Sequence, residues 1–236
     1  MHSLIIHMPG STERGANVER LLQVLPNAEV VEAVDGRLPE VQATTPTAPG
    51  DLFRPKYPFP LKGGEIGCFL SHRKCWQRIV DEGWDAALVV EDDLEIAPEK
   101  LPALLELIQR HAMPDAFIRI PPKDREPQTA VVDSEQGLTL FTPSVIGLQT
   151  TAQLVGRDAA KRLLAATETL DRPVDTFLQM HWVTGQSVQT ILPNGAREKT
   201  FGSGSTVQQK SGGSGQKLVR EIQRFKYRSA VKRRPQ

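Results

Sequence analysis

The chain has little cysteine, few aromatic residues and no long apolar run. Two of its 236 residues are cysteine, and aromatic residues make up 6% of the composition. No window approaches the roughly 20 consecutive apolar residues that a transmembrane helix requires. The first nine residues lack a basic segment and hold an apolar run of only three residues, so we expect no signal peptide. These absences predict a cytoplasmic protein.

The two cysteines fall in one predicted helix over residues 64–82. Cys68 and Cys75 are seven residues apart in the sequence, which places them about 10 Å apart along a helix axis. That distance is too long for a disulfide within an intact helix. We therefore expect two free thiols, as is typical of a reducing compartment.

The charge is balanced overall but not along the chain. The net charge is +1, whereas residues 217–236 hold eight basic residues and one acid, a net +7, which leaves −6 for the rest. Gly- and Ser-rich stretches before this tail are typical of flexible linkers. We predict one domain over residues 1–200, a flexible linker over 201–216 and a basic tail over 217–236.

Apolar periodicity predicts alternating strands and helices, and the opening strand–helix–strand pattern favours a parallel sheet. Residues 37–62 contain six prolines, so we expect a long loop there. A second loop is expected over the polar residues 121–137. The predicted strands cover residues 3–8, 28–34, 85–91, 116–120 and 187–192, with short antiparallel strands within 138–155. The predicted helices cover residues 14–25, 64–82, 98–111, 157–169 and 174–183.

Three carboxylates, Glu91, Asp92 and Asp93, directly follow the apolar run 86–90 of the strand predicted over residues 85–91. Ligands of open α/β sheets collect beyond the carboxyl ends of the strands. Grouped carboxylates repel one another unless a cation neutralises them, and Mg²⁺ or Mn²⁺ binds through carboxylates and phosphate oxygens. The alternative is a solvated turn with three acids facing water. The position after a buried strand favours the metal site.

The helix that starts near Gly64 carries several candidate polar residues. Its glycines suit a close approach of the backbone to a ligand or to another element. Glu65 is explained by the helix dipole alone, and a lone helical histidine such as His72 is more often packed than catalytic. Cys68, His72 and Cys75 share one face, but three ligands without a fourth cysteine make zinc a weak alternative.

Asp175 follows Arg172-Pro173-Val174 and falls in the first turn of a predicted helix. An acid at this position is favoured by the helix dipole, which is a sufficient structural reason for it. The functional alternative is a carboxylate that acts as a general base.

The segment Gly64–His72, together with Trp76 and the run Ala87–Asp93, resembles glycosyltransferase family 25. That family includes bacterial lipooligosaccharide galactosyltransferases and collagen galactosyltransferases. The resemblance covers roughly residues 3–192, and the helix-start segment is its most specific part. It implies a nucleotide-sugar-binding, GT-A-like α/β fold with a mixed, mainly parallel sheet flanked by helices. Three further segments agree in order: Ala33–Gly36, Thr150–Leu164 and Pro173–Asp175.

The resemblance also implies an inverting transfer of a sugar, with UDP-galactose as the expected donor, to a glycan acceptor in lipooligosaccharide or a related surface polysaccharide. Asp93, helped by Glu91, would hold Mn²⁺ or Mg²⁺ against the donor diphosphate. Asp175 would be the general base. The residues implied in donor binding are Arg14, Asp35, Glu65 and His72.

The sequence departs from the family pattern at two places. The first strand continues into His7–Arg14, where only Arg14 matches the usual segment, and Gln153 stands where an aromatic residue is usual. A degenerate, inactive transferase that acts as a binding module is therefore one alternative. A nucleotidyltransferase is another, although the chain has no early Gly-rich phosphate loop with a lysine.

The basic tail is expected to be helical, with Leu218, Ile222 and Phe225 on one side. Nucleic acid is not expected as a partner, because the tail has only two aromatic residues and the rest of the chain is acidic. Basic amphipathic segments bind anionic membranes, and family substrates are lipid-linked. We expect peripheral contact with the inner face of the plasma membrane.

Overall fold

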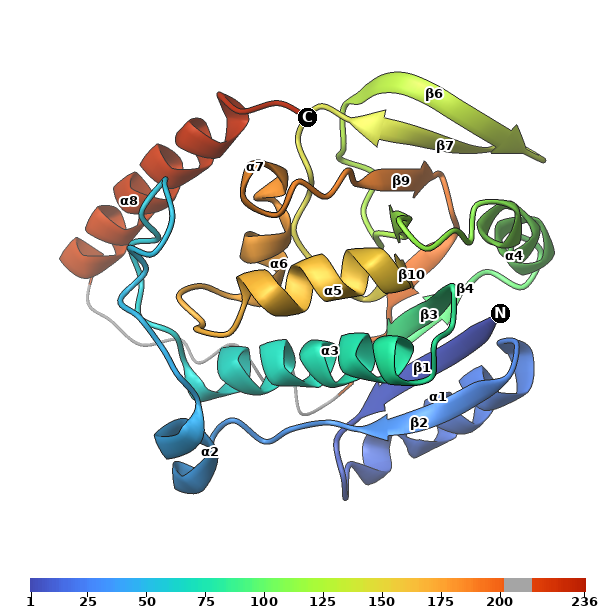
Figure 1. Cartoon of the computed structure of the whole chain (residues 1–236), viewed down its shortest axis with the longest axis horizontal. Coiled ribbons are helices and arrows are strands. Elements are labelled where there is room, and N and C mark those ends of the chain that lie inside the picture. Colours follow the sequence, from blue (N-terminus) through green and yellow to red (C-terminus); the bar gives the residue numbers. More distant parts are fainter. Residues whose placement is uncertain (202–213) are drawn as a thin grey trace.

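An eight-stranded sheet runs through the molecule in the order β2-β1-β3-β8-β5-β9-β7-β6 (Figure 1). The computed structural model describes residues 1–201 and 214–236. The strands of this sheet are β1 (His2–His7), β2 (Ala28–Glu32), β3 (Ala86–Glu91), β5 (Phe117–Arg119), β6 (Gln128–Glu135), β7 (Leu138–Pro143), β8 (Ala152–Gly156) and β9 (Gln189–Leu192). A second, two-stranded sheet joins β4 (Leu94–Ile96) to β10 (Ala196–Glu198).

The large sheet is mixed, and most of its strands share one direction. β1 is parallel to β2 and to β3, and β5 is parallel to β9. β8 is antiparallel to β3 and β5, and β7 is antiparallel to β6 and β9. Only β7 and β8 therefore run against the other six strands of this sheet. The predicted mixed, mainly parallel α/β fold is confirmed.

Helices cover both faces of the sheet, because side chains of consecutive strand residues point to opposite faces. Leu4 and Ile6 of β1 join one apolar core under α3, α5 and α6, whereas Ile5 joins a second core under α1 and α4. The main helices are α1 (Thr12–Val24), α3 (Gly63–Asp81), α4 (Leu101–Arg110), α5 (Arg157–Ala166) and α6 (Val174–Leu178).

Some elements differ from those predicted. The expected loop over residues 121–137 contains β6, an edge strand of mostly exposed residues in which polar side chains surround Val131 and Val132. The proline-rich loop contains α2 (Pro39–Thr44), in which Pro39 occupies the helix start, where its missing N–H is tolerated. The helix predicted over 174–183 is divided into α6 and α7 (His181–Thr184).

The basic tail forms α8 (Ser214–Lys232), which is docked onto the rest of the chain. Tyr227 and Val231 are buried, and the Tyr227 hydroxyl accepts a hydrogen bond of 3.1 Å from Arg172. Most of the predicted linker lies outside the described residues, and its last three positions, 214–216, begin α8. No helix of the described ranges has the length and apolar character needed to cross a membrane.

Candidate active site

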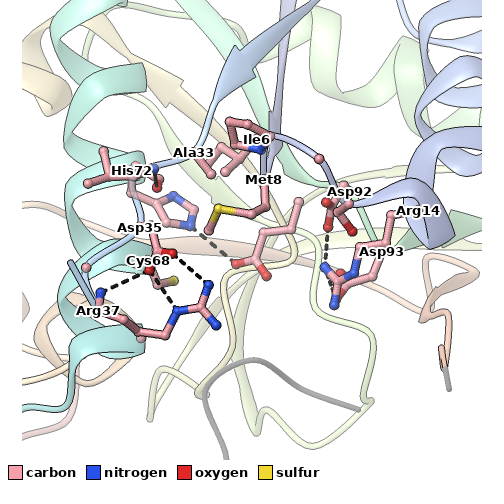
Figure 2. Close-up of a pocket in the computed structure, with 18 residues that line it drawn as sticks. Ile6, Met8, Arg14, Ala33, Asp35, Arg37, Cys68, His72, Asp92 and Asp93 are labelled. Atoms are coloured by element: carbon pink, nitrogen blue, oxygen red, sulfur yellow. Dashed lines mark hydrogen bonds and ion pairs between the residues drawn. The ribbon is translucent and has the colours of Figure 1, made fainter. Parts of the chain in front are cut away.

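A cavity of about 340 Å³ opens at the carboxyl ends of β1, β2 and β3 (Figure 2). Asp92, Asp93 and Arg14 lie on one side of it, and Asp35, Arg37 and Cys68 lie on the other. Glu65 and Asp175 are not among its lining residues. Five of the residues predicted from the sequence line the cavity: Arg14, Asp35, His72, Glu91 and Asp93.

Asp92 is the structural member of the acidic cluster. It is 4% exposed. One of its carboxylate oxygens lies 2.7 Å from His7 Nδ1, and Arg14 donates to the other. The Asn17 amide donates to the Asp92 carbonyl oxygen at 2.8 Å, which fixes the backbone of the turn. Both carboxylate oxygens of Asp92 therefore already have partners within the chain.

Asp93 is the member with an unpartnered carboxylate oxygen. Its Oδ2 lies 3.4 Å from Arg14, whereas its Oδ1 is buried and receives no hydrogen bond from any described residue. Burial, followed by the negative charge of Glu91, raises the pKa of Asp93 to about 7. A buried carboxylate with an unpartnered oxygen beside a second carboxylate fits a divalent cation.

Glu91 is held in place by donors from two other elements. Its Oε1 lies 3.3 Å from His72 Nε2 and accepts a hydrogen bond of 2.6 Å from the Thr150 hydroxyl. Burial alone would raise the pKa of Glu91, but His72, Thr150 and the charge of Arg14 together hold that pKa below its ordinary value. Glu91 is thus kept ionised next to Asp93.

His72 is fully buried, and its second ring nitrogen is also bonded. Nδ1 lies 2.9 Å from the Gln153 side-chain amide. Donation from that amide leaves the proton on Nε2, which then donates to Glu91. Gln153, the residue that departs from the family pattern, therefore orients the histidine that holds the acid.

Cys68 adds a third type of ligand beside Glu91. The ligand atoms of Cys68, His72 and Glu91 all lie within 4.8 Å of one another. Cys75, considered with Cys68 and His72 as a zinc ligand, is instead buried in the apolar core. Burial, followed by the charges of Glu91 and Asp175, raises the pKa of Cys68, so the thiol stays protonated without a metal.

The glycines of α3 bring its first turn against the exit of β2. A Cβ on Gly67 would collide with the Val34 carbonyl oxygen and lie 2.6 Å from the Gly36 nitrogen. The close approach predicted for this motif is therefore to another element of the chain. This close approach places Cys68 and His72 of α3 in the cavity wall.

Asp35 lies at the rim of the cavity in a pair with Arg37. Arg37 donates to its carboxylate at 2.8 Å and 2.7 Å, and these hydrogen bonds lower the pKa of Asp35. A guanidinium group thus stands at the mouth of the cavity beside a carboxylate. The predicted role of Asp35 in donor binding stays a prediction.

Glu65 and Asp175 lie outside the cavity lining. The Glu65 carboxylate accepts the Lys62 backbone N–H at 2.8 Å, which caps the start of α3. Asp175 accepts backbone N–H groups of Thr176 at 2.6 Å and Gln149 at 3.3 Å. Gln149 directly precedes Thr150, whose hydroxyl bonds Glu91, so these two adjacent residues connect Asp175 to the cavity wall.

The sequence did not point to the segment after β10. The Lys199 backbone N–H donates to the Asp93 carbonyl oxygen at 2.8 Å, and the charge of Glu198 contributes to the raised pKa of Asp93. The Phe201 ring lies 5.3 Å from the Arg14 guanidinium carbon. β10 pairs with β4, which lies about 100 residues earlier in the sequence, and this pairing brings the segment to the site. No local sequence pattern predicts a pairing between such distant residues.

The family model described as glycosyltransferase family 25 (LPS biosynthesis protein) matches residues 1–178. The chain belongs to glycosyltransferase family 25. The match covers the cavity lining, including the acidic cluster and α3. It ends before β9, β10 and α8.

Two relatives of this family 25 chain carry different descriptions. The probable inactive glycosyltransferase 25 family member 3 of Bos taurus is 32% identical over 68% of this chain and 28% of its own length. Procollagen galactosyltransferase 2 of Mus musculus is 33% identical over 68% of this chain and 27% of its own length. The chain therefore spans about a quarter of these relatives.

Two solved structures are similar at low scores. A 4-diphosphocytidyl-2C-methyl-D-erythritol synthase has a TM-score of 0.37 and 14% identity, over 94% of this chain and 98% of that chain. A CMP:2-keto-3-deoxy-manno-octonic acid synthetase complexed with CTP has a TM-score of 0.42 and 15% identity, over 97% and 99% of the two chains. Similarity at these scores carries no argument about this chain.

Proposed function

We propose that this family 25 protein is an inverting hexosyltransferase that moves galactose from UDP-galactose to a glycan acceptor of lipooligosaccharide or a related surface polysaccharide. The observation that carries the proposal is the unpartnered Asp93 oxygen beside Glu91, in a cavity at the carboxyl ends of β1 and β3. The galactosyl donor is supported by the descriptions of relatives as procollagen galactosyltransferases.

Asp93, with Glu91 as a second ligand, would hold Mn²⁺ or Mg²⁺, which when bound neutralises charge on the departing diphosphate. The chain's own residues prepare this position. Thr150 and His72 hold the Glu91 carboxylate ionised, and Arg14 adds a positive charge 3.4 Å from Asp93. Arg37 at the rim is a second group suited to diphosphate oxygens.

The transfer needs a base on the acceptor side. In the proposed step the acceptor hydroxyl oxygen forms a bond to the anomeric carbon, and the bond from that carbon to the diphosphate oxygen breaks. The hydroxyl proton passes to Asp175, whose orientation is fixed by the N–H groups of Thr176 and Gln149. Because Asp175 stands beside the cavity, the acceptor would bind between the cavity and α6.

We place this reaction in the cytoplasm, at the inner face of the plasma membrane, with a lipid-linked glycan as acceptor. The second candidate function is an inactive transferase that binds a nucleotide sugar without turnover. It is favoured by relatives whose descriptions include the word inactive. A nucleotidyltransferase is the third candidate, and it would release diphosphate from a nucleoside triphosphate.

A ligand panel separates these candidates. Thermal unfolding would be followed with Mn²⁺ and UDP, UDP-galactose, UDP-glucose, UDP-N-acetylglucosamine or CTP, and hydrolysis of each would be scored in parallel. A ligand at one hundred times its Kd stabilises the folded state by about 2.7 kcal/mol. We expect stabilisation and slow hydrolysis with UDP-galactose. Stabilisation without any turnover on glycan acceptors supports the inactive protein, and no response to any UDP compound contradicts the proposal.

A further inference from the structure

Helix α8 has two apolar faces. Tyr227 and Val231 are buried against the rest of the chain. Leu218, Ile222 and Phe225 are 66%, 47% and 71% exposed. At 3.6 residues per turn these three residues fall within an arc of about 60° on the side of the helix opposite Tyr227. We call Leu218, Ile222 and Phe225 the outer stripe.

Basic side chains flank the outer stripe. Lys226 lies on one side of it, and Arg228 and Lys232 lie on the other, and all three are exposed. One acid, Glu221, lies on the same side as Arg228 and Lys232, and its charge is paired with Arg224. Arg224 also lies against the Phe59 ring, whose centroid is 5.5 Å away. An exposed apolar stripe with lysine and arginine on both sides is the composition of helices that lie in a membrane interface.

We propose that α8 binds an anionic membrane surface through the outer stripe, with Lys226, Arg228 and Lys232 among the lipid headgroups. Charge favours this partner over a second copy of the chain, because a symmetric contact through the stripe would bring like charges together. Anionic headgroups complement the same charges. The proposal depends on α8 alone and holds for an active or an inactive transferase.

The inner face of α8 is held to the rest of the chain by Arg172 and by the buried residues Tyr227 and Val231. Arg172 is fully buried, donates to Tyr227, and also donates to the carbonyl oxygens of Phe53 and Pro55 at 3.2 Å and 3.1 Å. In Figure 1, α8 lies on the left, the side to which β1 and β2 direct their carboxyl ends. The cavity lies at the carboxyl ends of these strands.

The test is co-sedimentation of the full chain with vesicles of phosphatidylcholine alone or mixed with phosphatidylglycerol. The first variant combines Leu218→Ser, Ile222→Ser and Phe225→Ser. Its control combines Val131→Ser and Val132→Ser on β6, where both side chains are exposed. We expect the native chain and the control to bind mixed vesicles, and the stripe variant to bind at least about tenfold more weakly because it no longer buries apolar area.

A charge variant, Lys226→Glu with Arg228→Glu, addresses the headgroup contact. Each basic residue near an anionic surface contributes about fivefold in affinity, so we expect binding at least about 25-fold weaker. The matched control is Lys123→Glu with Arg125→Glu, at two exposed positions away from α8. Binding of the native chain should fall as salt is added.

Three outcomes would overturn the proposal. The first is equal binding of the native chain to neutral and mixed vesicles, and the second is full binding by the stripe variant. The third is a native chain that binds no vesicles and forms a dimer, together with a stripe variant that is monomeric. Transfer to a soluble acceptor should be unchanged in the stripe variant, because none of the three stripe residues lines the cavity. A native chain that binds mixed vesicles but transfers no sugar would contradict the proposed function and would still support membrane binding by α8.

Discussion

Asp92 and Asp93 are adjacent in the sequence and both contact Arg14, but their carboxylate oxygens are not equally partnered. Asp92 is satisfied by His7 and Arg14, whereas Asp93 retains a buried oxygen without a donor among the described residues. A satisfied buried carboxylate stabilises the fold, and an unsatisfied one destabilises it until a cation arrives. The two acids should therefore give opposite results when they are changed.

Asp92→Asn should lower the free energy of unfolding by about 3 kcal/mol, because it leaves Arg14 without its buried counter-charge. Urea denaturation measures this change. The control is Asp158→Asn, whose exposed pair with Lys161 should contribute less than about 0.5 kcal/mol. Equal effects of the two changes would contradict a structural role for Asp92.

Asp93→Asn should stabilise the metal-free chain at high pH. The folded-state pKa of Asp93 is about 7, above its ordinary value of 3.8, so the folded chain binds more protons than the unfolded chain between these values. This residue therefore lowers the free energy of unfolding as pH rises from about 4 to 7. With EDTA present, we expect Asp93→Asn to raise the free energy of unfolding by about 1–3 kcal/mol at pH 8 and to change it little at pH 4. A variant less stable than the native chain at pH 8 would contradict this account.

Asp175→Asn should lower turnover at least about a hundredfold, the usual contribution of a positioned general base. Donor binding should change little, because Asp175 is not part of the cavity lining. Turnover and the Kd for UDP-galactose would be measured side by side, with Asp158→Asn as the control. If donor binding fell in parallel with turnover, Asp175 would be a donor-binding residue, which contradicts its role as the base for the acceptor.

At the scale of elements, the contact between α3 and the exit of β2 positions the cavity wall. Gly36 and Gly67 allow the two backbones to touch. This contact fixes the position of α3, and so brings Cys68 and His72 next to Glu91. Sequence reasoning recognised that these glycines require a close approach. It could not name the partner, because nothing local to α3 encodes the position of the chain 30 residues earlier.

Gly67→Ala should lower the free energy of unfolding by about 2–3 kcal/mol, since its Cβ has no space between Val34 and Gly36. Gly15→Ala is the matched control within α1, where a Cβ meets nothing within 4 Å. That change should stabilise the chain by up to about 1 kcal/mol, because alanine favours the helix. Destabilisation of similar size at both positions would show that the α3 contact is unimportant.

Other elements show where local sequence reasoning stops. The continuous apolar run of β3 predicted a central strand and so the location of the acidic cluster. β6 is exposed, most of its residues are polar as in a loop, and its strand form depends on pairing with β7. Strands of three residues such as β4 and β10 carry too few positions for a periodic pattern, so Glu198 could not be assigned to the site.

At the scale of the whole molecule, the order of the strands decides which predicted residues meet. β1 lies between β2 and β3, so Arg14, Asp35 and Asp93, which follow these three strands, line one cavity. The partners of Asp92 and Glu91 come from elsewhere in the chain, His7 and Thr150 among them. These contacts join residues more than 50 positions apart and follow from tertiary packing, which the sequence pattern does not specify.

The central claim is that Asp93 provides the metal site of a sugar transfer. The most direct measurement is the release of UDP from UDP-galactose with a glycan acceptor, for the native chain and Asp93→Asn, over a titration of Mn²⁺ after EDTA treatment. We predict turnover by the native chain that rises to saturation with Mn²⁺, and at least about a hundredfold less by Asp93→Asn at every concentration. Equal turnover by the two proteins, or turnover indifferent to the metal, would contradict it.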